Sequence, residues 1–279
     1  RSSGISNPNQ PLGSFLFIGA SGVGKTLTAK NLARSLSPTR SNNLIQINMS
    51  EFMEKHSISK FLGAPAGYVG YDEDKSLVEK IRQNPYSVVL FDEIEKADRN
   101  ILNILLQILD EGKITDSKGR LINFRNSLII LTSNIGTSEL NKLSKLGFST
   151  EEKTIHNKTK LIKKEVEKKL QENLSPELLN RLDSVLIFNH LNLNDLKKIA
   201  EKEIKSLKKR LRNKKIKIII SDKKIASFIV NHKINPNEGA RLIKKELERS
   251  LEPLIAEKII QNNSKNIKVS LEKNKIKVN

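Results

Sequence analysis

The chain has 279 residues, of which 37% are hydrophobic and 29% charged, which fits one large domain or a medium and a small one and excludes a peptide hormone or minimal scaffold. It contains no cysteine, which excludes a disulfide framework, a thiolate metal site and a cysteine nucleophile. The net charge of +19 lies mostly in the second half, because residues 1–150 have 18 basic and 14 acidic residues and residues 151–279 have 32 and 17.

Five short apolar runs alternate with helical patterns in the first 190 residues. The runs are Phe15–Ile18, Leu44–Ile47, Ser87–Phe91, Leu128–Thr132 and Val185–Phe188. Between them, residues 75–82 and 100–109 have helical patterns, the second with its leucines and isoleucines on one stripe. Continuous apolar strands alternating with helices are typical of a parallel sheet that is covered on both faces. We therefore expect residues 1–190 to form one α/β domain with a five-stranded parallel sheet.

The pattern changes after His190. Apolar residues three and four apart predict a helix over 196–211, and a β-rich run at 216–220 ends at Ser221, a plausible N-cap for the next helix. A further helix is expected over 239–260. The runs at 267–271 and 275–278 surround a turn and predict a hairpin. Residues 191–279 are therefore expected to form a small α+β domain.

A glycine-rich stretch follows the first predicted strand and opens the first predicted helix. It satisfies the phosphate-loop pattern G-x4-G-K-T, in which backbone amides surround a β-phosphate, the lysine reaches the β- and γ-phosphates and the threonine supplies an oxygen to magnesium. A turn that only joins a strand to a helix is the alternative. The residues predicted to bind the nucleotide are Gly19, Ala20, Ser21, Gly22, Val23, Gly24, Lys25, Thr26 and Leu27.

Polar residues also end the third and fourth predicted strands. Asp92 and Glu93 follow Val88–Phe91, at the sheet edge where ligands of α/β proteins bind. We expect Asp92 to hold magnesium, with Thr26, and Glu93 to polarise the attacking water. Asn134 could orient the same water, although alone it would more often be a turn residue. Together these residues predict ATP hydrolysis with ATP/ADP and Mg²⁺ as cofactors.

Seven blocks in this order resemble the second ATPase module of the Clp/heat-shock AAA+ unfoldases. They lie at residues 51–57, 67–71, 85–96, 115–120, 131–134, 176–183 and 239–241, so the resemblance covers nearly the whole chain. The block at 115–120 and the region after Asn134 most resemble the ClpC branch, which partners the Clp peptidase, rather than the ClpB-type disaggregases. The resemblance implies a P-loop AAA+ fold and a homo-oligomeric, usually six-membered ring. Such a ring hydrolyses ATP at subunit boundaries and threads unfolded or tagged proteins through a central pore.

The resemblance also assigns roles outside the phosphate loop. Arg181 resembles the arginine finger that reaches a neighbour's γ-phosphate, and Arg241 the sensor arginine of the small domain; by spacing alone both would be solvated cations. Tyr68 and Val69, between two glycines, resemble the pore loop that grips substrate, and residues 111–120 resemble a second pore loop or an ordinary hairpin.

One further tripeptide resembles the peptidase-docking element of the Clp ATPases. It consists of Leu146, Gly147 and Phe148. A helix end capped by the glycine, with the phenylalanine folded back on it, is the competing interpretation.

Two other functions compete with the unfoldase prediction. A nucleic-acid motor of the AAA+ class would use the basic second half, but lysines dispersed through helical patterns with few aromatics favour a solvated face. A nucleotide-binding scaffold without turnover would not need the Asp92–Glu93 pair. No apolar run approaches the ~18 residues that cross a bilayer, and residues 1–9 lack an apolar signal segment, so we expect a soluble protein. Abundant lysine, asparagine and isoleucine point to an AT-rich genome, hence a plastid stroma (apicoplast or chloroplast) or a bacterial cytoplasm.

Overall fold

The computed structural model of the chain describes residues 7–36, 43–54, 57–63, 77–138, 164–234, 239–262, 266–272 and 275–278. By their contacts, these residues form two compact units. The first comprises residues 1–19 and 24–188, and the second comprises residues 189–279 together with the short segment 20–23. Each unit contains its own cluster of buried apolar side chains.

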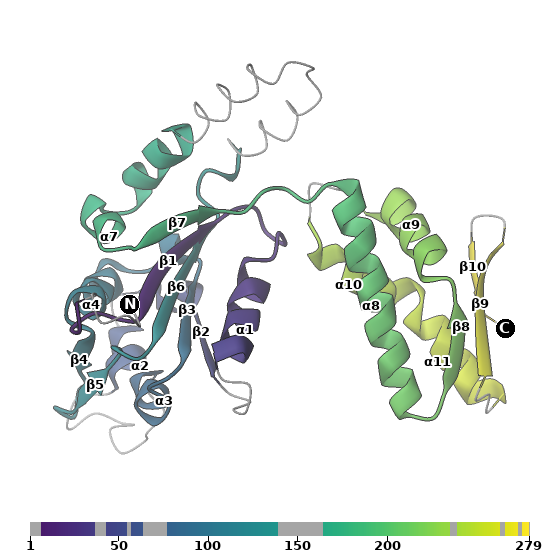
Figure 1. Cartoon of the computed structure of the whole chain (residues 1–279), viewed down its shortest axis with the longest axis horizontal. Coiled ribbons are helices and arrows are strands. Elements are labelled where there is room, and N and C mark those ends of the chain that lie inside the picture. Colours follow the sequence, from purple (N-terminus) through teal and green to yellow (C-terminus); the bar gives the residue numbers. More distant parts are fainter. Residues whose placement is uncertain are drawn as a thin grey trace. The chain divides into compact units, whose positions relative to one another are not determined.

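A five-stranded sheet forms the centre of the first unit. Its strands are β1 (Gly13–Ile18), β2 (Leu44–Asn48), β3 (Val88–Asp92), β6 (Leu128–Ser133) and β7 (Ser184–Ile187). They are ordered β2-β3-β6-β1-β7, and every neighbouring pair is parallel (Figure 1). The five apolar runs are therefore confirmed as the strands of one parallel sheet, and the carboxyl ends of all five strands lie at one edge.

Alternate strand residues point to opposite faces of this sheet, and helices bury both. On one face, Phe17, Leu90 and Ile130 pack with Ala29 and Ala33 of α1 (Lys25–Leu36). The other face packs against α3 (Leu77–Gln83) and α4 (Arg99–Glu111), which lie across the sheet from α1 in Figure 1. The first unit also has short elements, which are η1 (Met49–Phe52), α2 (Ile58–Leu62), η3 (Ile94–Lys96), α7 (Pro176–Asn180), β4 (Lys113–Thr115) and β5 (Leu121–Asn123).

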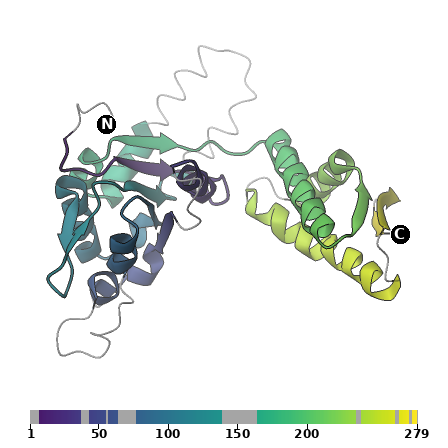
Figure 2. The same cartoon turned by 60° about the horizontal axis from the view of Figure 1, so that its bottom comes forward.

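The second unit combines helices with a three-stranded sheet, as the sequence predicts. Its elements are α8 (Leu193–Asn213), β8 (Lys217–Ile220), α9 (Asp222–Lys233), α10 (Arg241–Ser250), α11 (Glu252–Asn262), β9 (Asn266–Glu272) and β10 (Lys275–Val278). Strands β9 and β10 form the predicted antiparallel hairpin, drawn in yellow in Figure 2, and β8 joins β9 in parallel. Asn192 and Asp195 form a capping box that begins α8.

The prediction of one helix over 239–260 is wrong. The chain forms two helices there, α10 and α11, separated at Leu251. Pro253 is the second residue of α11; proline has no backbone N–H and its ring clashes with the preceding turn. The apolar period continues through this break, which explains why periodicity alone did not reveal it.

A buried ionic network joins α3 to the hairpin formed by β4 and β5. Glu79 of α3 is 2% exposed, and its carboxylate accepts hydrogen bonds from Arg82 at 2.7 and 2.9 Å. Arg120 of the hairpin lies 3.2 Å from the same carboxylate and donates through Nε to Asp116 at 2.7 Å. The sequence allows either a second pore loop or an ordinary hairpin at residues 111–120. In the structure this segment enters a hairpin that ion pairs and hydrogen bonds join to α3.

We expect Glu79→Gln to reduce the free energy of unfolding by about 2–3 kcal/mol at pH 7, because charged hydrogen bonds from partly exposed arginines are lost. Hydrogen bonds from Arg82 hold the pKa of Glu79 at about 2, below its ordinary 4.5. A depressed carboxyl pKa stabilises the fold above pH 4.5, and this stabilisation is lost as the pH falls toward 2.

Urea unfolding of the parent and Glu79→Gln between pH 7 and pH 3 measures this contribution. The two unfolding free energies should differ most at pH 7 and converge at low pH. The control is Glu248→Gln, which removes an exposed pair with Lys244 at 3.8 Å and should cost less than about 0.5 kcal/mol. A gap between parent and Glu79→Gln that does not narrow on acidification would contradict the assignment.

Candidate active site

The glycine-rich stretch lies where the sequence places it, between β1 and α1. Strand β1 ends at Ile18 and α1 begins at Lys25. Gly22 and Gly24 have φ angles of 78° and 109°, a region that side-chain-bearing residues rarely adopt. A Cβ on Gly24 would meet nothing within 4 Å, so glycine is needed there for the backbone conformation and not for space. The loop leads directly into the amino end of α1, an arrangement that phosphate-binding sites use.

Lys25 is a buried cation at the carboxyl edge of the sheet, with 8% of its surface exposed. Its Nζ donates to the carbonyl oxygen of Gly19 and, at 2.8 Å, to Oδ1 of Asn134. Burial lowers the pKa of Lys25, while the carboxylates of Asp92, Glu95 and Glu93 act in the opposite direction. The three carboxylates thus offset part of the cost of burying the ammonium charge.

The predicted acidic pair ends β3 beside the loop. Asp92 accepts hydrogen bonds from the hydroxyl of Thr132 and, at 3.1 Å, from Nε2 of Gln46. Glu93 has φ 60° and ψ 54°, a left-handed conformation that costs a non-glycine residue about 1–3 kcal/mol. Its backbone N–H donates to the Thr132 hydroxyl at 3.1 Å, and its carboxylate lies 2.5 Å from Nζ of Lys96. Strain of this kind is characteristic of residues held for a function.

Asn134 connects the two parts of the site. It follows β6, whose end lies beside that of β1 because Ile18 pairs with Ser133. Its Oδ1 accepts from Lys25, and its Nδ2 lies 3.5 Å from Oε1 of Glu93. The structure therefore brings Lys25, Asp92, Glu93 and Asn134 to one place, as predicted from the ends of the strands.

Four residues near this site are absent from the prediction: Gln46, Thr132, Glu95 and Lys96. Gln46 and Thr132 reach Asp92 from the neighbouring strands β2 and β6, so their roles depend on strand order and register. Glu95 and Lys96 form the turn after Glu93, and the sequence signal for them is that they follow Glu93 by two and three residues.

Arg181 lies near the amino ends of the strands, whereas Lys25 lies near their carboxyl ends. It follows α7 and precedes β7, which runs parallel to β1, and the N–H of Asp183 donates to Ser14 near the start of β1 at 2.9 Å. About four strand residues, or roughly 13 Å, separate this edge from the loop that follows Ile18. The Nε of Arg181 lies 2.9 Å from Oδ1 of Asp110, and its side chain is 44% exposed. Arg181 is therefore not part of its own chain's site.

The remaining predicted site residues are placed as follows. Arg241 is the first residue of α10 in the second unit and is exposed. Tyr68 and Val69 lie outside the described residues, as do Leu146, Gly147 and Phe148. Among the residues that the structure describes, no helix is long and apolar enough to span a bilayer.

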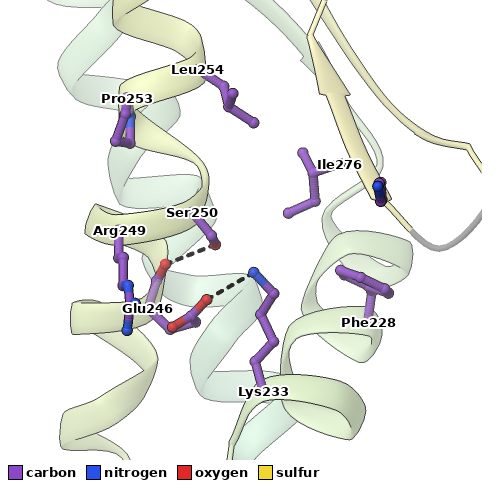
Figure 3. Close-up of a pocket in the computed structure, with 9 residues that line it drawn as sticks. Phe228, Lys233, Glu246, Arg249, Ser250, Pro253, Leu254 and Ile276 are labelled. Carbon is purple, nitrogen blue, oxygen red and sulfur yellow. Dashed lines mark hydrogen bonds and ion pairs between the residues drawn. The ribbon is translucent and has the colours of Figure 1, made fainter.

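A separate open cavity of about 590 Å³ lies within the second unit, between α9, α10, α11 and β10 (Figure 3). Phe228, Leu254 and Ile276 supply its apolar side, and an ion pair of 2.9 Å between Lys233 and Glu246 lies in it. None of the predicted ATP-binding residues lines it, so this cavity and the site around Lys25 are distinct.

Two family profiles match the chain and leave little of it uncovered. The AAA domain (Cdc48 subfamily) matches residues 10–185, and the C-terminal, D2-small domain of ClpB protein matches residues 191–271. The first profile covers the unit that holds the candidate active site.

Curated relatives carry the names of two Clp proteins. A chaperone protein ClpB of Prochlorococcus marinus is 46% identical over 94% of this chain, and an ATP-binding subunit ClpC of the Clp protease of Staphylococcus aureus is 42% identical over 93%. The chain spans 29% and 31% of the lengths of these relatives. A chaperone and a protease subunit both match well, so the predicted ClpC branch is not distinguished from ClpB. These names do not support the nucleic-acid alternative.

A solved structure matches the whole chain. A closed-state cryo-EM reconstruction of Hsp104 with ATPγS and FITC-casein has a TM-score of 0.84 and 34% identity, covering 99% of this chain and 46% of that one.

Proposed function

The chain belongs to the AAA+ ATPases, as a second ATPase module of the Clp group, and from this membership we propose that it hydrolyses ATP to unfold and thread proteins. One observation carries the proposal. A buried lysine of the phosphate loop is joined by Asn134 to Glu93, the carboxylate that would activate water. Binding alone would need the loop and the lysine, whereas hydrolysis also needs a general base.

Different residues of the site would bind the phosphates and activate the water. The loop amides and Lys25 would bind the β- and γ-phosphates, and the neutral amide of Asn134 would orient the water that Glu93 deprotonates. The ion pair with Lys96 would orient the Glu93 carboxylate, and the longer contact from Asn134 would add to this restraint.

The residues at the site fit Mg²⁺. Thr26 and Asp92 offer oxygen ligands, and the described residues contain no group of three or more His, Cys, Asp or Glu that would form an all-protein metal cage. Mg²⁺ in nucleotide sites usually takes one or two protein ligands and completes its shell with phosphates and water. When bound, it would neutralise charge on the phosphates.

The position of Arg181 supports assembly into a ring. An arginine finger must reach a γ-phosphate, and Arg181 lies on the sheet edge away from its own phosphate loop. In a ring whose neighbours meet head to tail, one chain's Arg181 edge would face the next chain's loop. We infer a homo-oligomer, six-membered by resemblance to the family, with Arg241 of the small domain acting as the sensor.

Further parts of the proposal come from the resemblance. Residues 1–190 would form the ATPase domain and residues 191–279 the small domain. Leu146, Gly147 and Phe148 would dock a Clp peptidase if the protein belongs to the ClpC branch. A plastid stroma or a bacterial cytoplasm as its location stays a prediction from composition.

We expect Tyr68→Ala, in the full-length protein, to keep ATPase activity within about threefold of the parent and to stop unfolding of a tagged fluorescent protein. The aromatic side chain would grip an extended backbone by packing without taking part in hydrolysis. The control is Tyr86→Ala, because Tyr86 is 59% exposed on the same unit and has no assigned role. Unfolding at the parent rate by Tyr68→Ala would contradict the pore assignment, and ATPase activity stimulated by DNA or RNA instead of unfolded protein would contradict the protein substrate.

A further inference from the structure

Glu95 is an acidic residue beside the site to which the phosphate-loop and acidic-pair motifs give no role. It lies in η3, the single turn that follows Glu93. Its Oε1 accepts a hydrogen bond from the backbone N–H of Asn134 at 3.1 Å. Its Oε2 is buried and has no hydrogen-bond partner among the described residues. Burying a carboxylate oxygen without a hydrogen-bond partner costs free energy. The presence of Glu95 at this position therefore needs an explanation.

The hydrogen bond from Asn134 to Glu95 fixes the backbone of the residue that bridges the site. The amide group of Asn134 must present Oδ1 to Lys25 and Nδ2 to Glu93 at the same time. The contact with Lys25 is 2.8 Å, whereas the contact with Glu93 is 3.5 Å and therefore weak by itself. The orientation of this amide thus depends on how its backbone is held.

A second hydrogen bond connects the same two segments in the opposite direction. The backbone N–H of Glu93 donates to the hydroxyl of Thr132 at 3.1 Å, while Glu95 accepts from Asn134. Residues 93–95 and 132–134 are thereby joined at two points, one at the left-handed Glu93 itself and one at Glu95 two residues later. A strained residue persists only where its surroundings determine its conformation, and these two bonds provide that restraint.

We propose that Glu95 is a positioning residue for ATP hydrolysis, which holds Asn134 so that its side chain spans Lys25 and Glu93. This inference rests on the proposed function, since it assigns Asn134 and Glu93 to catalysis. Glu95 acts through the acceptor atom Oε1, and a neutral acceptor of the same length would serve as well. A purely structural carboxylate would affect folding without a specific effect on turnover.

The experiment measures ATP turnover of the full-length protein with Glu95→Ala and Glu95→Gln. Glu95→Ala should lower kcat about tenfold, because a catalytic group loses a hydrogen bond that supports it. KM for ATP should stay within about threefold of the parent, because the phosphate loop is unchanged. Glu95→Gln keeps the acceptor and should recover kcat to within about threefold of the parent. If Glu95→Ala does not fold, Glu95→Leu fills the same volume without an acceptor and replaces it.

A matched control and a double mutant separate positioning from stability. Asp98→Ala removes another carboxylate–backbone bond, to Asn100 at 2.9 Å, and should lower the unfolding temperature without lowering kcat. Combining Glu95→Ala with Asn134→Ala should be no slower than Asn134→Ala alone, because both changes remove the same function.

Each result has one interpretation. Parent kcat in Glu95→Ala, independent effects of the two changes in the double mutant, or a Gln variant as slow as the Ala variant would overturn the positioning role. Glu93→Gln measured alongside separates this failure from that of the proposed function. A slow Glu93→Gln with an unaffected Glu95→Ala rejects only the inference. A Glu93→Gln that turns over ATP at the parent rate rejects the assignment of Glu93 as the base, and a parent protein without ATP turnover rejects the proposed function itself.

Discussion

Glu93→Gln in the full-length protein should bind ATP as the parent does and hydrolyse it at least about 100-fold more slowly, the usual contribution of a general base. Glutamine keeps the size and polarity of the side chain and can still contact Lys96 and Asn134, but it cannot accept a proton from water. The binding site is therefore kept while the chemistry is removed. Single-turnover hydrolysis and equilibrium binding of a fluorescent ATP analogue measure the two properties separately.

The control for this variant is Glu172→Gln, which neutralises an exposed carboxylate of the same unit and should leave both properties unchanged. Turnover by Glu93→Gln at the parent rate would show that another group activates the water. Loss of ATP binding would show instead that Glu93 shapes the pocket and is not its base.

Arg181→Ala should lower kcat about 1,000-fold, since an arginine that neutralises charge on a transferring phosphoryl group is worth 10³ or more. We expect this effect to cross between chains, because Arg181 lies near the amino ends of the strands, away from Lys25, and pairs with Asp110. ATP binding and ring assembly should persist, and sedimentation with nucleotide tests assembly. The control is Arg99→Ala, an exposed arginine that begins α4. Parent-level turnover by Arg181→Ala would remove the finger assignment.

The sequence predicts the middle of the central sheet well because strands β1, β3 and β6 are buried on both faces. A run such as Val88–Phe91 is apolar at every position, which sets it apart from the alternating or helical patterns around it. The carboxyl ends of parallel strands share an edge, so the sequence alone places Lys25, Asp92 and Asn134 together. The break at Leu251 cannot be predicted in this way, because the apolar period continues through it.

The partners of the site residues could not be predicted in the same way. Gln46 and Thr132 contact Asp92 only because β2 and β6 are both neighbours of β3, and a sequence does not state strand order. The left-handed turn at Glu93 likewise follows from tertiary restraint and not from its own preference. The bond from Asn134 to Glu95 depends on both features.

Mixing two inactive variants tests the shared site most directly. Full-length Glu93→Gln lacks the base but keeps Arg181, and full-length Arg181→Ala lacks the finger but keeps Glu93. In rings assembled from equal amounts of both, about one boundary in four should join an intact Glu93 to an intact neighbouring Arg181. We predict that the mixture regains ATPase activity well above either variant alone. A mixture that forms mixed rings but stays as inactive as its components would contradict a site built from two adjoining chains.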